Sequence, residues 1–138
     1  MAKVVGVDRH RATLRRIRGP AMKREVGKAI LASAGLVADE AALSVTAGAV
    51  SGRAHVASTA PNPPNADTHT LDRSIHAEKT GDLTAIAVAD ADHAVPQEFG
   101  TSRLEARPFM APAARKKGPD AARLVSAAAN RVVNGGNL

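Results

Sequence analysis

A run of apolar residues at helical spacing, beginning directly after Gly19-Pro20, constrains the fold of this chain more than any other feature. The apolar side chains recur every three or four residues, which places them on one face of a long amphipathic helix over roughly 20–47. Such a helix is about 40 Å long at 1.5 Å per residue, and Gly48 is a suitable stop. Other elements must then cover its apolar face. The recurring residues are Met22, Val26, Ile30, Ala34, Val37, Ala41 and Val45.

Two glycines, Gly27 and Gly35, lie inside this predicted helix. Each costs the helix about 1 kcal/mol relative to alanine, so a structural reason for it is expected. A glycine in a helix allows a neighbouring segment to approach the backbone closely, or it marks a local bend. The pattern predicts one of these two features at each glycine.

The middle of the chain predicts a loop followed by a β-hairpin. Residues 58–67 contain three prolines in four positions, which excludes both a helix and a central strand. After this Pro-rich loop, apolar and polar residues alternate on both sides of Thr80-Gly81-Asp82, a pattern that predicts two antiparallel strands and a tight turn. The alternating residues are Leu71, Ile75 and Ala77 before the turn, and Thr84, Ile86 and Val88 on one face of the returning segment 83–89.

The last third of the chain predicts two helices, over about 108–117 and 120–133. Pro119 favours the start of the second helix, and Gly135-Gly136 favours its end. One long helix, a small antiparallel sheet with a hairpin, and C-terminal helices together predict an α+β fold. The length of 138 residues fits a single domain, 1–138.

The composition has 30 alanines, two phenylalanines, and no tryptophan, tyrosine or cysteine. Large rings normally supply much of the buried area of a core, so small aliphatic side chains predict a marginally stable monomer that an oligomer would stabilise. The absence of cysteine excludes disulfides, thiol nucleophiles and cysteine-ligated zinc. No long unbroken apolar run occurs, which predicts no membrane span. The first residues lack the apolar stretch of a signal peptide, which predicts synthesis in the cytosol.

Charge is segregated along the chain, whose formal net charge is +6. Residues 1–28 hold nine basic and two acidic side chains, residues 29–102 three and nine, and residues 103–138 seven and two. Basic ends around an acidic middle suit subunits that meet oppositely charged neighbours, a face turned toward DNA, or simply a solvated surface. The candidate contacts for DNA or a partner are Arg9, Arg11, Arg15, Arg16 and Arg18 near the N-terminus, and Arg115, Lys116 and Lys117.

The arginine-rich segment 1–19 predicts a short basic arm or a helical turn, ended by Gly19-Pro20. Clustered cations are sufficient to neutralise phosphates, so non-specific contact with DNA stays open as an alternative. Stacking on bases needs aromatic platforms, and two rings are too few for that. Sequence-specific recognition of DNA is therefore not expected.

The polar residues contain no motif of catalysis or metal binding. The five histidines form no i, i+4 pair and no H-E-x-x-H sequence, no serine lies in G-x-S-x-G, and no glycine-rich phosphate loop occurs. A protein that is not an enzyme, without a metal or cofactor, is therefore the prediction. The groups that come closest to a site are His69 and His76 with Asp67 and Asp72 as metal ligands, and Asp90, Asp92 and Glu98 as an acid–base set.

Residues 94–114 contain Glu98-Phe99-Gly100-Thr101 and, after a short linker, Ala106-Arg107-Pro108-Phe109 followed by Pro112. This combination is similar to the tail-completion, or head–tail joining, family of long-tailed bacteriophages. A second segment, Thr68-His69-Thr70-Leu71-Asp72-Arg73-Ser74-Ile75, resembles that family's Thr-Gly-x-Leu-Arg-x-Ser-Ile sequence and is preceded by Ala60-Pro61. His69 stands where the family usually has glycine, and Asp72 where it usually has arginine. With the long helix before these segments, the resemblance covers nearly the whole chain.

The motif at 94–114 also carries physical expectations. A strand-like segment would end at Gly100, which permits a positive-φ turn directly after Phe99. Pro108 would start a helix that places Phe109 against the sheet, and both phenylalanines fit a core. Arg107 is expected to pair with Glu98 or Glu105, within the subunit or across an interface. The candidate motif or interface residues are Glu98, Phe99, Gly100, Thr101, Arg107, Pro108, Phe109 and Pro112.

The resemblance implies a structural virion protein of the phage neck, a ring subunit that joins head-closure proteins to the tail tube and surrounds the DNA channel. A hexameric ring is favoured by analogy with neighbouring tail parts, and a dodecamer stays open. Ring closure needs heterologous contacts, so a basic end of one copy is expected to meet the acidic middle of the next, more weakly at high salt. Such a protein assembles in the host cytoplasm and is located at the head–tail junction of the virion. The alternatives are a head-closure or tail-terminator protein of the same neck, or a small basic DNA-binding protein.

Overall fold

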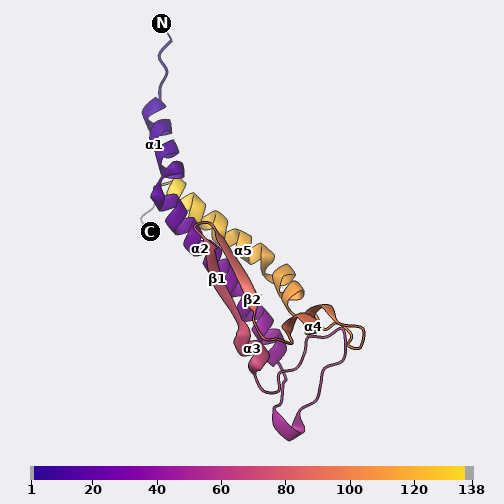
Figure 1. Ribbon diagram of the computed structural model, residues 1–138. Helices are drawn as coiled ribbons and strands as arrows, with labels where there is room; N and C mark the ends of the chain where they lie inside the picture. The colour runs from indigo at the N-terminus through magenta and orange to yellow at the C-terminus, as the bar shows by residue number, and fades with distance from the viewer. Residues whose placement is uncertain (1, 136–138) are drawn as a thin grey trace.

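Residues 2–135 are described by a computed structural model of the chain. Figure 1 shows an elongated molecule in which α2 (Pro20–Thr46) and α5 (Met110–Val133) lie side by side, with a two-stranded hairpin against α2. The hairpin consists of β1 (Ile75–Gly81) and β2 (Thr84–Ala89). The shorter elements are α1 (Val7–Arg18), the 3-10 turn η1 (Gly52–Ala54), α3 (Thr70–Ser74) and α4 (Ala94–Phe99). The predicted α+β class is confirmed, in a molecule that is mostly helical.

The long helix α2 is the element against which the others pack, and its predicted range is confirmed to within one residue. It contacts α5, both strands and α3, so its small apolar residues are covered from more than one side. By length and mean hydropathy α2 also meets the criteria for a membrane-spanning helix, criteria that the core helix of a globular domain meets equally well.

The core lies around the C-terminal end of α2. Val45 and Phe109 are its largest fully buried side chains, and Leu71 packs with them among buried alanines. Residues 58–67 form neither helix nor strand, as predicted. The loop is anchored next to the core, because the N–H of Ala66 donates a hydrogen bond to the carbonyl of Val45 at 2.9 Å.

The two glycines of α2 differ in what lies beside them. A Cβ at Gly27 would collide with the carbonyl oxygen of Asp82 in the hairpin turn, so the close approach predicted there is confirmed. Among the described residues, no atom from outside the adjoining backbone of α2 lies within 4 Å of the Cβ position at Gly35. Gly27 therefore lets the hairpin lie directly on the helix, whereas no neighbouring segment among residues 2–135 explains Gly35.

The hairpin is confirmed from Ile75 onward, with β1 and β2 antiparallel. Ile75 pairs with Ala89 and Ala77 with Ala87, and these residues share one face of the ladder. Ile86 lies on the opposite face and is exposed. The alternation in the sequence therefore identifies the strand correctly, but the alanines of β2, rather than its larger side chains, face the body of the molecule.

Residues 70–74, predicted to begin the first strand, form the short helix α3 instead. Leu71 and Ile75 are four residues apart, a spacing that suits one helical turn as well as an alternating strand. In the helix Leu71 is buried in the core, and Ser74 Oγ donates a hydrogen bond to the carbonyl of Leu71 at 2.7 Å. His69 precedes α3 with a φ of 59°, the left-handed conformation that glycine adopts most readily.

The prediction of two C-terminal helices is wrong, because α5 runs from Met110 to Val133 without interruption at Pro119. A proline inside a helix removes one backbone N–H and normally breaks the helix. Here Gly118 and Pro119 lie on an exposed face, while buried alanines before and after them pack against α2. Tertiary packing therefore keeps the helix continuous. The predicted glycine stop is confirmed at Gly135, whose φ is 70°, and Gly136 lies outside the described residues.

The N-terminal basic arm is more regular than the predicted arm or single turn. Residues 7–18 form the helix α1, in which no residue is buried. Gly19 separates α1 from α2, and Pro20 is the first residue of α2, as predicted. The main contacts of α1 are with α2 and α5, and Figure 1 shows α1 projecting beyond the end of the hairpin.

Candidate functional site

Glu98 lies near the end of α4 and closes the N-terminus of α5. Its Oε2 accepts hydrogen bonds from the N–H groups of Phe109 and Met110 at 2.7 and 2.9 Å, and its Oε1 accepts one from Ala111 at 3.0 Å. The next residue, Pro112, has no N–H, so the first four backbone positions of α5 leave no donor unpaired. The carboxylate also complements the positive end of the helix dipole. The segment predicted to be strand-like is thus the end of a helix, and Glu98 fixes one helix on another.

The two phenylalanines of the motif have opposite environments. Phe109 is 1% exposed and belongs to the core, as predicted, although α5 begins at Met110 rather than at Pro108. Phe99 is 76% exposed, so the expectation that both rings are core residues is wrong for Phe99. The positive-φ turn directly after it is confirmed at Gly100, whose φ is 74°.

The link between α4 and α5 is a compact turn. The N–H of Thr101 donates a hydrogen bond to the carbonyl of Leu104 at 2.8 Å, and Thr101 Oγ1 accepts bonds from the N–H groups of Arg103 and Leu104. A Cβ at Gly100 would meet the Leu104 carbonyl within 3 Å, so the turn has no room for a side chain there. Thr101 and Gly100 therefore have local structural roles.

Arg107 is bound to backbone atoms rather than to a carboxylate. Its N–H donates to the carbonyl of Gln97 at 2.7 Å, and its Nε donates to the carbonyl of Ser58 at 3.2 Å. Within residues 2–135 it forms no ion pair with Glu98 or Glu105, so the predicted pairing inside the subunit is wrong. Arg107 instead joins the Pro-rich loop to the α4–α5 link.

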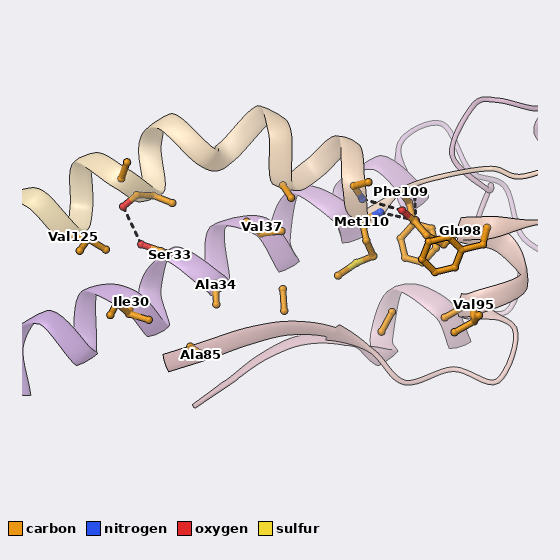
Figure 2. Close-up of a pocket in the computed structure, with 18 of the residues that line it drawn as sticks. Ile30, Ser33, Ala34, Val37, Ala85, Val95, Glu98, Phe109, Met110 and Val125 are labelled. Atoms are coloured by element: carbon orange, nitrogen blue, oxygen red, sulfur yellow. Dashed lines mark hydrogen bonds between the residues drawn. The ribbon is translucent and has the colours of Figure 1, made fainter. Parts of the chain in front are cut away.

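An apolar groove of about 1010 Å³ lies between α5 and β2, with α2 as its floor. Figure 2 shows Ile30 and Ala34 of α2 pointing into the space between the helix and the strand. Alanines of β2 line one wall and residues of α5 the other, and α4 closes one end with Val95 and Phe99. The one ionisable group in the lining is Glu98, whose two oxygens already accept hydrogen bonds. The groove is thus suited to an apolar occupant.

The floor of the groove is held together by Ser33. Its Oγ lies 2.8 Å from the carbonyl of Ala29 in α2 and 3.2 Å from the carbonyl of Ala121 in α5. This side chain is buried and links the two long helices at the groove's base. The groove is therefore part of the framework of the fold.

The second basic cluster is largely occupied within the chain. Lys116 and Lys117 of α5 both form ion pairs with Glu40 of α2. The hydrogen bond from Lys116 holds the pKa of Glu40 below its ordinary value. Arg115 of the same cluster is exposed. Most of the charge predicted here for a partner thus serves helix packing instead.

The first basic cluster, on α1, is exposed. Arg11, Arg15 and Arg18 recur at i, i+4 and i+7 and therefore share one face of the helix. Arg16 points elsewhere, with Nη1 3.4 Å from the carbonyl of Val133 at the end of α5. The arginine face of α1 remains available for an external contact.

Ser51, His69 and Asp72 form a hydrogen-bonded series with the order of a hydrolase triad. Ser51 Oγ lies 3.3 Å from His69 Nε2, and His69 Nδ1 lies 3.2 Å from Asp72 Oδ2. A working triad also needs N–H donors beside the nucleophile for the oxyanion. The N–H of Gly52, directly after Ser51, donates to the Asp67 carboxylate at 2.8 Å instead, which puts a negative charge near that position. This arrangement suits a clamp between loop and helix better than catalysis.

The histidines predicted as the nearest approach to a metal cluster are divided by the structure. His69 bonds to Asp72, whereas His76 lies 3.5 Å from Glu78 and 3.6 Å from Asp90. Donation from His76 Nδ1 to the carbonyl of Ser74, together with these two acids, raises the pKa of His76. Within residues 2–135 no three His, Asp or Glu side chains gather closely enough to hold a metal ion.

Two of these features, the cap and the groove, are not predicted by the sequence patterns described above. The cap by Glu98 joins residues 11 to 13 positions apart through a folded turn, and no local pattern marks it. The groove depends on small residues of β2 facing inward, which the alternation of larger side chains concealed. A run of alanines at every second position, as at Ala85, Ala87 and Ala89, is the signal that marks such a face.

No protein-family model, curated protein or solved structure matches this chain.

Proposed function

We propose that the chain is a structural subunit of an oligomeric assembly, located in the neck of a long-tailed bacteriophage where head and tail join. The observation that carries the proposal is the apolar groove of about 1010 Å³, which a single chain leaves open with Phe99 exposed at its end. Extended exposed apolar surface on a small protein marks an interaction site. The groove lacks the convergent polar groups that orient a small substrate or a cofactor.

The location in the phage neck is inferred from the resemblance to the tail-completion family. The local structure of the residues that match the family supports this inference. Residues 98–112, which carry most of the first matching segment, form one corner, in which Glu98 caps α5 and Phe109 fills the core. His69, where the family usually has glycine, has a φ of 59°, the conformation that glycine favours. The segments that resemble the family therefore contain a helix cap and a left-handed backbone conformation, both of which restrict the residues allowed there.

In the proposed role, copies of the chain form a ring between the head-closure proteins and the tail tube. Six copies are favoured and twelve are the alternative. Exposed basic residues such as Arg9 of α1 and Arg115 of α5 offer non-specific contact with DNA that passes through the channel. Head-closure and tail-terminator proteins occupy adjoining levels of the same neck and remain the nearest alternatives.

The test combines the mass of the purified protein by light scattering with imaging of intact particles. The proposal expects a ring at the head–tail junction with a defined copy number. A ring at an adjoining level would favour one of the two neighbouring neck proteins. A protein that is monomeric, absent from particles, and retards DNA in a salt-sensitive way would replace the proposal with the DNA-binding alternative.

A hydrolase is the second candidate, favoured only by the series Ser51, His69 and Asp72. It predicts hydrolysis of a small activated ester such as p-nitrophenyl acetate, lost in Ser51→Ala. Equal background rates for the wild-type protein and the variant would exclude it.

A further inference from the structure

We infer that the groove between α5 and β2 binds helix α1 of a neighbouring copy of the same chain. The inference rests on the oligomer of the proposed function and names the contact that builds it. Each copy inserts its arm into the next copy, so that the two contacting surfaces are different ones. Repetition of such a heterologous contact closes a ring.

The arm carries apolar side chains that a single chain leaves uncovered. Val7, Leu14 and Ile17 fall along one side of α1, at spacings of seven and three residues, and each remains partly exposed. The segment before the helix adds Val4 and Val5, which are 76% and 83% exposed. An apolar stripe on the arm and an apolar groove on the body are complementary surfaces.

The dimensions of the two surfaces agree. The 12 residues of α1 span about 18 Å at 1.5 Å per residue. The groove is lined along α5 from Met110 to Ser126, a rise of about 24 Å by the same measure. One helix of the arm's length therefore fits within the groove and occupies most of its length.

The charges of the two surfaces are also complementary. Arg11, Arg15 and Arg18 lie on the face of α1 next to its apolar stripe. The wall formed by β2 has acidic residues on either side, with Asp82 before the strand and Asp90 and Asp92 after it. An arm seated in the groove with its arginines toward β2 brings the basic end of one copy to the acidic middle of the next.

The arm does not reach the groove of its own chain in this structure. Figure 1 shows α1 leading away from the body at the end of α2, and Arg16 holds it against the last turn of α5. Folding back into the groove would require a reversal of the chain at Gly19 and loss of that contact. The geometry therefore favours donation of the arm to another copy.

Cross-linking between two separately purified variants tests the contact, because the chain has no native cysteine. Leu14→Cys is mixed with Val125→Cys at one end of the groove or with Val95→Cys at the other, and one variant carries a tag that identifies the mixed product. A short bismaleimide reagent is expected to join the arm of one copy to the groove of the other. Val56→Cys, exposed just before the Pro-rich loop and outside the groove, is the matched control and should give little mixed product. No mixed product above this control would overturn the inference.

Association measured by light scattering provides the second test. Leu14→Glu with Ile17→Glu should weaken association at least tenfold, whereas Leu43→Glu, equally apolar and exposed on α2 away from the groove, should leave it unchanged. Arg15→Glu should weaken association by about two- to fivefold, and the added change Asp92→Arg should restore it. Arm variants that assemble like the wild-type protein would contradict the inference.

The outcomes separate the inference from the proposed function. Mixed cross-links in a protein that is absent from phage particles would support the arm-to-groove contact and contradict the location in the neck. A ring at the neck without arm-to-groove cross-links would retain the assignment and remove the contact. A cross-link formed within one chain, in a Leu14→Cys and Val125→Cys double variant that stays monomeric, would show that the arm covers its own groove and would also overturn the inference.

Discussion

Two regions of the molecule differ in how far their side chains are buried and hydrogen-bonded within the chain: the corner at residues 98–112 and the arm at residues 2–18. In the corner, Glu98 accepts three hydrogen bonds from α5, and Phe109 is buried in the core. In the arm no residue of α1 is buried. The corner thus belongs to the stability of one chain, whereas the arm has apolar and basic surface left for a partner. Interface residues are therefore to be sought in the arm and the groove, although the corner carries the more distinctive sequence.

The sharpest test of this contrast compares the two phenylalanines. Phe109→Ala should lower the free energy of unfolding by about 3–5 kcal/mol, because it leaves a cavity in the core. Phe99→Ala should change it by less than about 0.5 kcal/mol, because that ring is largely in solvent. Denaturant unfolding at low protein concentration measures both values. Similar losses in the two variants would mean that Phe99 is covered within the chain.

The second test concerns the cap of α5. Glu98→Ala should lower the free energy of unfolding by about 2–3 kcal/mol, because one buried and two partly buried N–H groups lose their acceptor. Glu105→Ala removes an exposed acid from the adjoining turn and should cost less than about 0.5 kcal/mol. If both variants unfold alike, the corner is not the fixed region described above.

The third test extends the comparison to the two glycines of α2. Gly27→Ala should destabilise the chain by about 1–3 kcal/mol, because the added methyl group collides with the Asp82 carbonyl. Gly35→Ala meets open space and should stabilise the helix by up to about 1 kcal/mol. Thermal unfolding of the monomer distinguishes the two signs. A Gly35→Ala variant that is stable but fails to assemble would place a partner at that glycine.

The smallest expected effect is the pH dependence of the hairpin. The pKa of His76 is raised above its ordinary value of about 6.5, so its protonated form stabilises the fold. That contribution is present below pH 6.5 and is lost as pH rises through the raised pKa. The difference in melting temperature between the wild-type protein and His76→Gln should therefore shrink between about pH 6 and pH 8. A constant difference across this range would show that the charge of His76 makes no contribution.

The sequence determined the large elements well and their junctions poorly. The periodicity from Met22 to Val45 predicted α2 because a long apolar stripe has one regular solution. The interruption predicted at Pro119 does not occur, because packing along α2 outweighs the loss of one backbone hydrogen bond. The sequence predicts strand at Leu71 and at Glu98-Phe99, since short segments have spacings that fit either structure, but these residues lie in helices α3 and α4. Long-range contacts, which the local sequence does not reveal, determine whether such a segment forms a helix or a strand.

The candidate site was less predictable than the fold. Charge counting found the arginines of α1, but it gave the same weight to Lys116 and Lys117, which bind Glu40 inside the chain. The resemblance drew attention to Arg107 and Phe109, which hold the chain together, and not to the alanine face of β2 that lines the groove. A groove is made by several elements at once, so it exists only after folding.

The joint at Gly19-Pro20 has a consequence for how the number of subunits is decided. A ring of six turns each copy by about 60° relative to the last, and a ring of twelve by about 30°. If the arm docks in the groove in the same way in both rings, the groove does not determine the number of copies. The angle between α1 and α2 must then determine it. That angle is set at a single glycine, next to which the Arg15 carbonyl leaves no room for a Cβ. One residue outside the contact surface would then control the symmetry of the whole assembly, and Gly19→Ala would alter ring size before it altered the affinity between copies.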